Sequence, residues 1–378
     1  MDKNTTAAVE AASKPHFLML DALRGVAALI VIWYHVFEGF ATSPVDQMLN
    51  HGYLAVDFFF MLSGFVMCYA YDDRFASGMK FGQFARRRIR RLHPMLIVGV
   101  LLGVVAFVIQ GCVTWGGDKV EPIAVVIAML LTMLMIPALP GSVAEVRGNG
   151  EMFPLNGPTW SLFFEYIGYV LYAVLLRRFS TRLLAVFVAL MAAALVWSGA
   201  GNLSGAGHLG MGWTLADHNL LGGSLRLLFS FAAGLLICRI YRAKVIRGGF
   251  AICVALLLVL LSVPHMGTMW INGLYDSLVI VLVFPVVVWI GASSSAGKGR
   301  SRAFCTWLGD ISYPVYIVHY PVMYLFYAWV WAEELTFSQV WPVSVAIFFG
   351  VIILAFAFLK FYDEPVRRWL ARRRDRKS

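Results

Sequence analysis

The sequence predicts an all-α fold: a polytopic transmembrane helical bundle with about ten membrane-spanning helices and one further re-entrant or interfacial helix. Composition is the first reason, because 60% of the 378 residues are hydrophobic and only 14% are charged, which is more apolar than a soluble globular protein needs. Apolar stretches of roughly 18 to 23 residues, long enough to cross a bilayer, also recur along the chain. The lysines and arginines gather between these stretches, so the net charge of +10 indicates membrane topology rather than nucleic-acid binding.

Eleven apolar stretches are candidate spans. They cover residues 17–38, 54–71, 94–113, 122–139, 157–176, 182–199, 219–239, 248–265, 271–291, 307–330 and 340–361. The first stretch has no small-residue cleavage site, so we expect an uncleaved first helix. The five cysteines show no C-x-x-C spacing, and we expect no metal. The chain is thus divided into a tail at 1–16, a membrane domain at 17–361 and a basic tail at 362–378.

The basic segments decide which stretches cross, because positively charged loops stay in the cytoplasm. They lie at 74–91, 177–182, 239–247, 298–302 and 360–377. An even number of crossings must separate the first two segments, yet three candidates lie between them. The stretch 122–139 starts at a Glu-Pro step and ends in Pro-Ala-Leu-Pro-Gly, so we expect it to be the re-entrant or interfacial helix. Both termini are then cytoplasmic in a multi-pass protein of the cytoplasmic (inner) membrane.

Ionisable residues inside spans are costly and usually functional. On the first span, Arg24 and His35 are eleven residues apart, which places them on one helix face about 16 Å from each other. Arg24 is suited to hold an anion and His35 to move a proton. Glu38 follows one turn later on nearly the same face and is a candidate substrate contact. In the alternative interpretation, Arg24 snorkels to lipid headgroups and His35 is a satisfied residue between helices.

Asp57 lies near the outer end of the second span, level with His35. A carboxylate beside an imidazole fixes its tautomer and raises its basicity, so we interpret Asp57 as a catalytic partner of His35. The alternative is that Asp57 caps the start of its helix.

The strongest charge feature is the basic segment that ends at Pro94. Within it, Arg88 and Arg91 are three residues apart on one helical face, at the mouth of the third span. Guanidinium groups bind phosphate bidentately, so this pair suits a phosphate-bearing ligand. The alternative is that the segment serves only as a cytoplasmic topology anchor.

Three further polar or aromatic residues are candidates. Trp160 is a candidate substrate contact, although it also fits the aromatic belt of a membrane protein. Glu165 lies about 12 Å into its helix and is expected to face a cavity, as a third catalytic candidate, with Arg226 as a suggested counter-ion. His319 lies inside a later span, where it binds substrate or bridges helices.

In this order and spacing, the motifs resemble the acyltransferase-3 family of integral membrane O-acyltransferases, from about Leu20 to Leu370. The motifs are Leu20-Asp21-Ala22-Leu23-Arg24-Gly25 with His35, Gly52 to Phe65, Arg88 to Pro94, Trp160-Ser161-Leu162 with Glu165, Ser312-Tyr313 with His319, and Glu364-Pro365. The family's first-helix arginine and histidine fall on Arg24 and His35. Its arginine pair before the third helix falls on Arg88 and Arg91.

The resemblance implies ten membrane helices, a cytosolic acyl-CoA donor, most often acetyl-CoA, and an acceptor hydroxyl on a glycan or lipid-linked glycan at the far face. The expected partners are therefore membrane lipids, acyl-CoA and the glycan of the cell envelope, with no nucleic acid. Some members carry a soluble esterase-like domain after the membrane part. Because this chain ends at Ser378, a separate periplasmic transfer partner is a further expectation.

The residues and the resemblance lead to one hypothesis. The phosphates of acyl-CoA bind near Arg24, Arg88 and Arg91, and the thioester reaches His35, which acts as general base or as nucleophile. Either Asp57 or Glu38 orients the imidazole.

A rival interpretation is a proton-coupled secondary transporter of a small polar solute or glycan precursor. In that case His35, Asp57 and Glu165 form a proton relay without covalent chemistry. The arginine pair favours the acyltransferase, because a phosphate site is expected for a CoA donor and unnecessary for a carrier.

Overall fold

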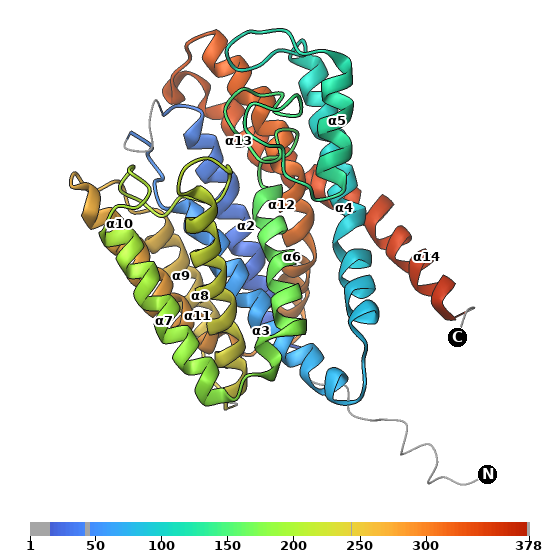
Figure 1. Ribbon diagram of the computed structural model, residues 1–378, viewed down its shortest axis with the longest axis vertical. Helices are drawn as coiled ribbons and strands as arrows, with labels where there is room; N and C mark the ends of the chain where they lie inside the picture. The colour runs from blue at the N-terminus through green and yellow to red at the C-terminus, as the bar shows by residue number, and fades with distance from the viewer. Residues whose placement is uncertain (1–15, 42–45, 243, 376–378) are drawn as a thin grey trace.

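The computed structural model describes residues 16–41, 46–242 and 244–375, which form a bundle of helices that run roughly along one axis (Figure 1). Within these residues there is no β-strand, only three isolated bridges between loop segments. The predicted all-α helical bundle is confirmed. Apart from His16, the predicted N-terminal tail at 1–16 lies outside the described residues.

Nine helical stretches of the described chain are long and apolar enough to cross a membrane. They are α2 (Leu18–Glu38), η1 with α3 (Gly52–Leu54, Ala55–Ala76), α4 (Phe81–Ile109), α6 with η2 (Thr159–Val174, Leu176–Arg178), α7 (Thr181–Ala200), α8 (Asn219–Ile240), α10 with η3 and α11 (Met269–Leu278, Val279–Val283, Phe284–Ala292), α12 (Arg300–Ala332), and α13 with η4 and α14 (Phe337–Phe358, Leu359–Asp363, Glu364–Asp375). The protein is therefore a multi-pass membrane protein.

Two apolar helices are shorter. The helix α5 (Pro122–Met133) has 12 residues, about 18 Å, and cannot cross about 30 Å of hydrocarbon. Its length agrees with the expectation for 122–139. The helix α9 (Gly249–Leu261) has 13 residues, although 248–265 was expected to cross. Pro264 explains the difference, because it disfavours helical backbone at Val263 and ends the helix early.

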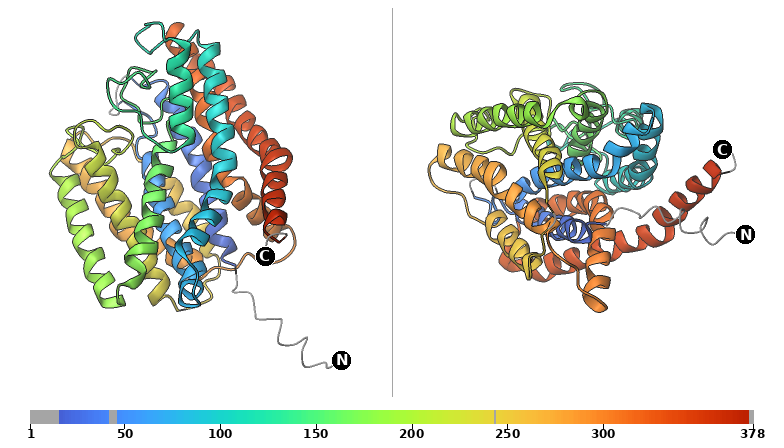
Figure 2. Two further views of the ribbon diagram at one scale, coloured as in Figure 1. Left: turned by 45° about the vertical axis from the view of Figure 1, so that its right-hand side comes forward. Right: turned by 90° about the horizontal axis from the view of Figure 1, so that it is seen from below.

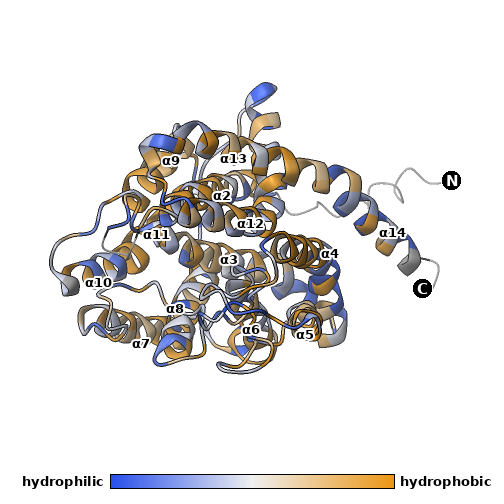
Figure 3. Ribbon diagram, turned by 90° about the horizontal axis from the view of Figure 1, so that it is seen from above, coloured by the Kyte–Doolittle hydropathy of each residue, from blue (hydrophilic) through white to orange (hydrophobic). Residues whose placement is uncertain are grey.

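The basic segments around 74–91 and 362–378 are more helical than expected. Only residues 77–80 separate α3 from α4, and Pro94, the expected first residue of the third span, lies inside α4. In the same way, most of the predicted tail at 362–378 is the helix α14, which extends away from the bundle (Figures 2 and 3). The hydropathy pattern underestimated the length of these helices, because their charged ends continue the helix beyond the apolar part.

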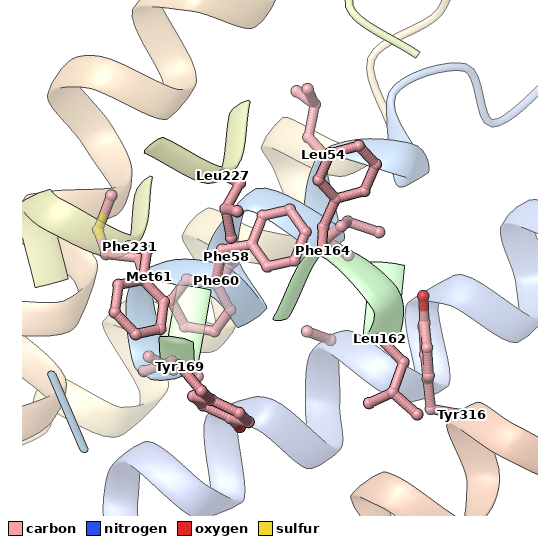
Figure 4. Packing of buried hydrophobic residues seen from close by; sticks show 14 of the residues in the cluster. Leu54, Phe58, Phe60, Met61, Leu162, Phe164, Tyr169, Leu227, Phe231 and Tyr316 are labelled. Carbon is pink, nitrogen blue, oxygen red and sulfur yellow. The ribbon is translucent and has the colours of Figure 1, made fainter. Parts of the chain in front are cut away.

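The centre of the bundle is built on close helix contacts. The helix α2 packs along α12, and α3 packs along α8. A Cβ atom added to Gly64 would lie 2.0 Å from the carbonyl oxygen of Phe231, so only glycine allows this approach of α3 and α8. Buried aromatic side chains, among them Phe58, Phe164 and Phe231, fill the space between α3, α6 and α8 (Figure 4). This packing holds α3 and α6 at the depth where the polar residues described below meet.

Candidate active site

His35 lies in the last turn of α2 and is held by a carboxylate. Its Nδ1 is 2.6 Å from Oε2 of Glu38, three residues later. The hydroxyl of Tyr327 on α12 lies 2.8 Å from the same Glu38 oxygen and 2.7 Å from the carbonyl oxygen of His35. With Nδ1–H donating to Glu38, the lone pair of the imidazole is on Nε2. Glu38 thus orients His35, as one of the two carboxylates considered for this role.

His35 lines a cavity of about 460 Å³, which we call the histidine cavity. Besides His35, its wall includes Tyr34, Glu38, Tyr53, Val56, Glu151, Trp160, His208, Trp213, Arg226, Tyr316 and Tyr320. This volume lies within the range of small-molecule sites. The wall combines aromatic rings with hydrogen-bonding groups, which suits a polar ligand.

Asp57 does not contact His35, and this placement was predicted wrongly. The carboxylate instead pairs with Arg226 on α8, with Nη2 2.6 Å from Oδ2 and Nε 3.2 Å from Oδ1. Both side chains are fully buried. Arg226 also donates to the backbone carbonyl oxygens of Met211 and Tyr53. Asp57 therefore neutralises a buried arginine in the wall of the histidine cavity, because a buried guanidinium without a partner would be costly.

Two other predicted substrate contacts lie near His35. Trp160 lines the histidine cavity, and the guanidinium carbon of Arg226 is 5.4 Å from the centre of its ring. His319 is fully buried, with its ring centre 5.2 Å from that of His35. Its Nδ1 is 3.2 Å from the carbonyl oxygen of Val315, and its Nε2 has no hydrogen-bond partner among the described residues. The hydrogen bond to Val315 lies within α12, the ring contact with His35 reaches α2, and His319 is not among the residues that line the histidine cavity. Its role in substrate binding or in bridging helices stays a prediction.

A second, narrower cavity of about 90 Å³ carries the predicted arginines, and we call it the basic cavity. Its wall includes Arg24, Val56, Phe60, Ser63, Met67, Arg88, Arg91, Leu162, Glu165, Ser312 and Tyr316. The three arginines come from α2 and α4, and the structure brings them together as the sequence predicted.

Arg24 is positioned by its own helix and by a close contact with α12. Its Nη1 is 2.9 Å from Oδ1 of Asp21, one turn earlier. The next residue, Gly25, faces α12, where an added Cβ atom would lie 2.2 Å from the carbonyl oxygen of Leu308. The Arg24-Gly25 pair thus places a cation beside a tight helix crossing, which explains the glycine in this motif.

Arg88 and Glu165 belong to one hydrogen-bonded group inside the basic cavity. Arg88 is buried and donates from Nη2 to the hydroxyl of Tyr169, at 2.6 Å. The hydroxyls of Tyr169 and Ser63 both donate to the carboxylate of Glu165. Glu165 therefore faces a cavity as expected, but the suggested pairing with Arg226 is wrong, since Arg226 pairs with Asp57.

Sequence reasoning missed a polar group at the wall of the histidine cavity. Asp276 in α10 accepts from the hydroxyl of Tyr53 at 2.7 Å and lies 3.5 Å from Nε2 of His51. The nearby His208 lines the cavity itself. Burial lowers the pKa of His51 and of His208 to about 4 in each case. Asp276 lies inside the predicted span 271–291, so the rule that singled out Asp57 would have found it.

Comparison with known proteins finds acyltransferases that match nearly the whole chain. A family model described as an acyltransferase domain matches residues 17–360. Acyltransferase MdmB of Streptomyces mycarofaciens is 26% identical over 94% of this chain and 92% of its own length. The putative peptidoglycan O-acetyltransferase YrhL of Bacillus subtilis is 25% identical over 92% of this chain and 54% of its own length. Protein 2 in the picA locus of Rhizobium radiobacter is 34% identical over 42% of this chain. No solved structure matches the chain.

Proposed function

The chain belongs to the acyltransferase-3 family, and we propose that it moves an acetyl group from cytosolic acetyl-CoA to a hydroxyl of a glycan or lipid-linked glycan at the far face of the cytoplasmic membrane. Family membership makes the protein an O-acyltransferase and decides against the proton-coupled carrier. One observation carries the finer proposal: a cavity with three arginines adjoins a cavity that contains an oriented histidine. The first suits a phosphate-bearing donor and the second suits proton transfer.

The donor binds with its phosphates at the arginines. Arg24 is half-buried and Arg91 is exposed at this end of the bundle, whereas Arg88 is buried beside Tyr169. Arg88 keeps its Nε without a hydrogen-bond partner among the described residues. This N–H group can donate a hydrogen bond to the CoA chain, because a buried N–H group is stabilised when it finds an acceptor.

His35 acts on the acceptor hydroxyl. As general base it takes the hydroxyl proton while the oxygen attacks the thioester carbonyl, the C–S bond breaks and the CoA thiol leaves with a proton. As nucleophile, Nε2 attacks the thioester carbonyl, the C–S bond breaks and the CoA thiolate leaves; the acceptor oxygen then displaces the imidazole from the acetyl carbon, and the hydroxyl proton goes to the thiolate. In both routes the Glu38 carboxylate stabilises the cationic imidazole, because it accepts from Nδ1 at 2.6 Å.

The acceptor is proposed from the wall of the histidine cavity and from a relative. Its aromatic rings, such as Trp160 and Trp213, stand beside hydrogen-bonding groups, such as Glu151. Such a wall suits a sugar ring, which has both apolar faces and hydroxyls. The name of the relative YrhL refers to peptidoglycan, a glycan of the cell envelope. A separate periplasmic protein that receives the acetyl group remains part of the proposal.

The test has two parts. In the first, the purified protein is heated with CoA, acetyl-CoA or adenosine, and we expect the first two to raise the unfolding temperature, since a ligand that binds the folded state stabilises it. In the second, envelope glycans are compared by mass in cells that lack the gene and in cells that carry wild type or His35→Gln. We expect an acetyl increment that only wild type restores. No stabilisation by CoA and identical glycans would contradict the proposal.

A further inference from the structure

Two side chains line both cavities: Val56 on α3 and Tyr316 on α12. On α12, Ser312 lines the basic cavity and Tyr320 lines the histidine cavity. Each is four residues from Tyr316, so the three side chains lie along one face of the helix. This face therefore passes from one cavity to the other, with Tyr316 at the junction.

The helix α3 crosses the junction at the same level. Tyr53 lines the histidine cavity, whereas Phe60 and Ser63 line the basic cavity, and Val56 lies between them. On both α3 and α12, the residues on one side of this layer line the histidine cavity and those on the other side line the basic cavity. The junction is therefore a thin wall between two spaces that adjoin end to end.

Tyr316 fills this junction and is held across it. Its hydroxyl is 2.6 Å from Oγ of Ser161 on α6, and Ser161 in turn donates to the carbonyl oxygen of Pro158 at 3.0 Å. The ring of Tyr316 packs edge-on against Phe59, with ring centres 5.5 Å apart, and lies beside Leu162 (Figure 4). The hydroxyl also lies 3.5 Å from the carbonyl oxygen of Pro158. These hydrogen bonds join neutral groups, and such bonds are exchanged at little net cost.

We propose that Tyr316, together with Val56, is the partition that separates the acyl donor from the acceptor space and that moves aside when the thioester advances to His35. This inference rests on the proposed function. The thioester must pass this layer, because the arginines lie on one side and His35 on the other. The basic cavity of about 90 Å³ is also smaller than a typical ligand site, so the donor arm needs side chains to move.

The partition has a chemical purpose. If water from the histidine cavity reached the thioester, its oxygen would attack the carbonyl carbon and the C–S bond would break. Acetate and the CoA thiol would then be released without transfer. Enzymes that handle such groups exclude water until the acceptor is bound. Tyr316 is thus a positioning residue, which controls when the thioester meets His35.

The direct test is access to a cysteine in the basic cavity. In a full chain without its native cysteines, Met67→Cys marks the basic cavity and Ser204→Cys marks the histidine cavity, which both residues line. Sealed vesicles receive a membrane-impermeant maleimide on the face that labels Ser204→Cys. We expect slow labelling of Met67→Cys through a minor open state, and labelling about tenfold faster or more when Tyr316→Ala is added. Tyr316→Phe, which keeps the ring, should stay slow.

The matched control is Tyr320→Ala, which removes the same ring one turn away at a residue that lines only the histidine cavity. It should leave the labelling of Met67→Cys slow. If Tyr316→Ala does not fold, Val56→Ala opens the same layer from α3. Equal labelling rates with and without the Tyr316 ring would overturn the proposal, and so would equal acceleration by Tyr320→Ala.

A second readout separates this inference from the proposed function. CoA, added from the opposite face, should protect Met67→Cys from the reagent if the basic cavity binds the donor. Faster labelling in Tyr316→Ala without protection by CoA would support the partition and contradict the donor site. With acetyl-CoA and no acceptor, Tyr316→Ala should also release CoA thiol several-fold faster than Tyr316→Phe.

Discussion

The basic cavity and the histidine cavity adjoin inside one bundle but differ in size and in chemistry. The basic cavity, at about 90 Å³, is narrow and carries three arginines. The histidine cavity, at about 460 Å³, is lined by aromatic rings, histidines and carboxylates. The wide cavity is already formed for a ligand, whereas the narrow one must open. This difference fits the proposed function, in which a flexible, phosphate-bearing donor and a bulky polar acceptor occupy separate spaces that adjoin at one layer.

The two cavities also differ in how charge is neutralised. At the histidine cavity, Arg226 of the wall is neutralised by the buried carboxylate of Asp57. In the basic cavity, Glu165 is the carboxylate among the described lining residues that faces three arginines, and Arg24 has a further partner in Asp21. Positive charge therefore remains for an anionic ligand in one cavity and not in the other.

The largest expected effect separates the two cavities by function. His35→Gln should lower transfer about 10²- to 10⁴-fold, because the amide cannot accept a proton at neutral pH. Affinity for CoA should stay near wild type, since the proposed phosphate site is in the other cavity. Arg24→Ala should show the opposite pattern, with donor binding weakened most. Turnover in folded His35→Gln above about a tenth of wild type would remove His35 from the chemistry.

The next effect concerns the buried pair of Asp57 and Arg226 at the wall of the histidine cavity. Asp57→Ala should lower the free energy of unfolding by about 3 to 5 kcal/mol, because it leaves Arg226 buried without a counter-ion. The double variant Asp57→Leu with Arg226→Met should recover much of this loss in denaturant titrations. Transfer activity in a folded double variant would show that Asp57 is structural. A stable but inactive double variant would show that the reaction needs the pair, of which Arg226 lines the histidine cavity.

In the basic cavity, Arg91→Ala and Arg88→Ala should each weaken CoA binding by about 1.5 to 3 kcal/mol, the value of a charged hydrogen bond to phosphate. Arg91→Lys should recover only part of the affinity, because an ammonium group binds as a point charge. Calorimetric titration with CoA measures these changes. Arg87→Ala is the matched control, because Arg87 is exposed on the same helix and does not line the cavity. Equal losses in all three alanine variants would indicate a general charge effect.

A smaller effect tests how His35 is oriented. Tyr327→Phe removes the hydroxyl that lies 2.8 Å from Glu38 and should raise the barrier to transfer by about 0.5 to 1.5 kcal/mol. The rate should fall a few-fold while CoA affinity stays unchanged. If donor affinity fell as much as the rate, the hydroxyl would serve the packing of α2 and α12 rather than His35.

The smallest effect is a dependence of stability on pH near the histidine cavity. Burial lowers the pKa of His51 and His208 to about 4, so between about pH 6.5 and pH 4 the unfolded chain binds protons that the folded chain does not. Stability should therefore fall as pH falls, by at most about 1.4 kcal/mol per pH unit for each histidine. Thermal unfolding at several pH values measures this slope. The variant with both His51→Gln and His208→Gln should have a flatter slope, and an unchanged slope would assign the effect to other groups.

Local features of the sequence were sufficient for the membrane bundle and for part of the candidate site. Hydropathy predicts the spans because each span must cover its own length of hydrocarbon. Helical spacing brings Arg24 and His35 to one face and places Glu38 within reach of Nδ1, since these residues share α2. The arginine pair of α4 depends on the same local regularity. Each of these relations joins residues of the same helix, and within a helix the residue number alone determines the direction of a side chain.

The tertiary structure alone decided which helices meet. Asp57 pairs with Arg226, 169 positions away, and Glu165 lies with Ser63 and Tyr169. The position of Tyr316 between the two cavities likewise depends on α3, α6 and α12 meeting at one depth. A sequence shows which face of a helix is polar, but the partner of that face is set by the packing of whole helices, in which close contacts such as that of Gly25 with Leu308 fix the distances.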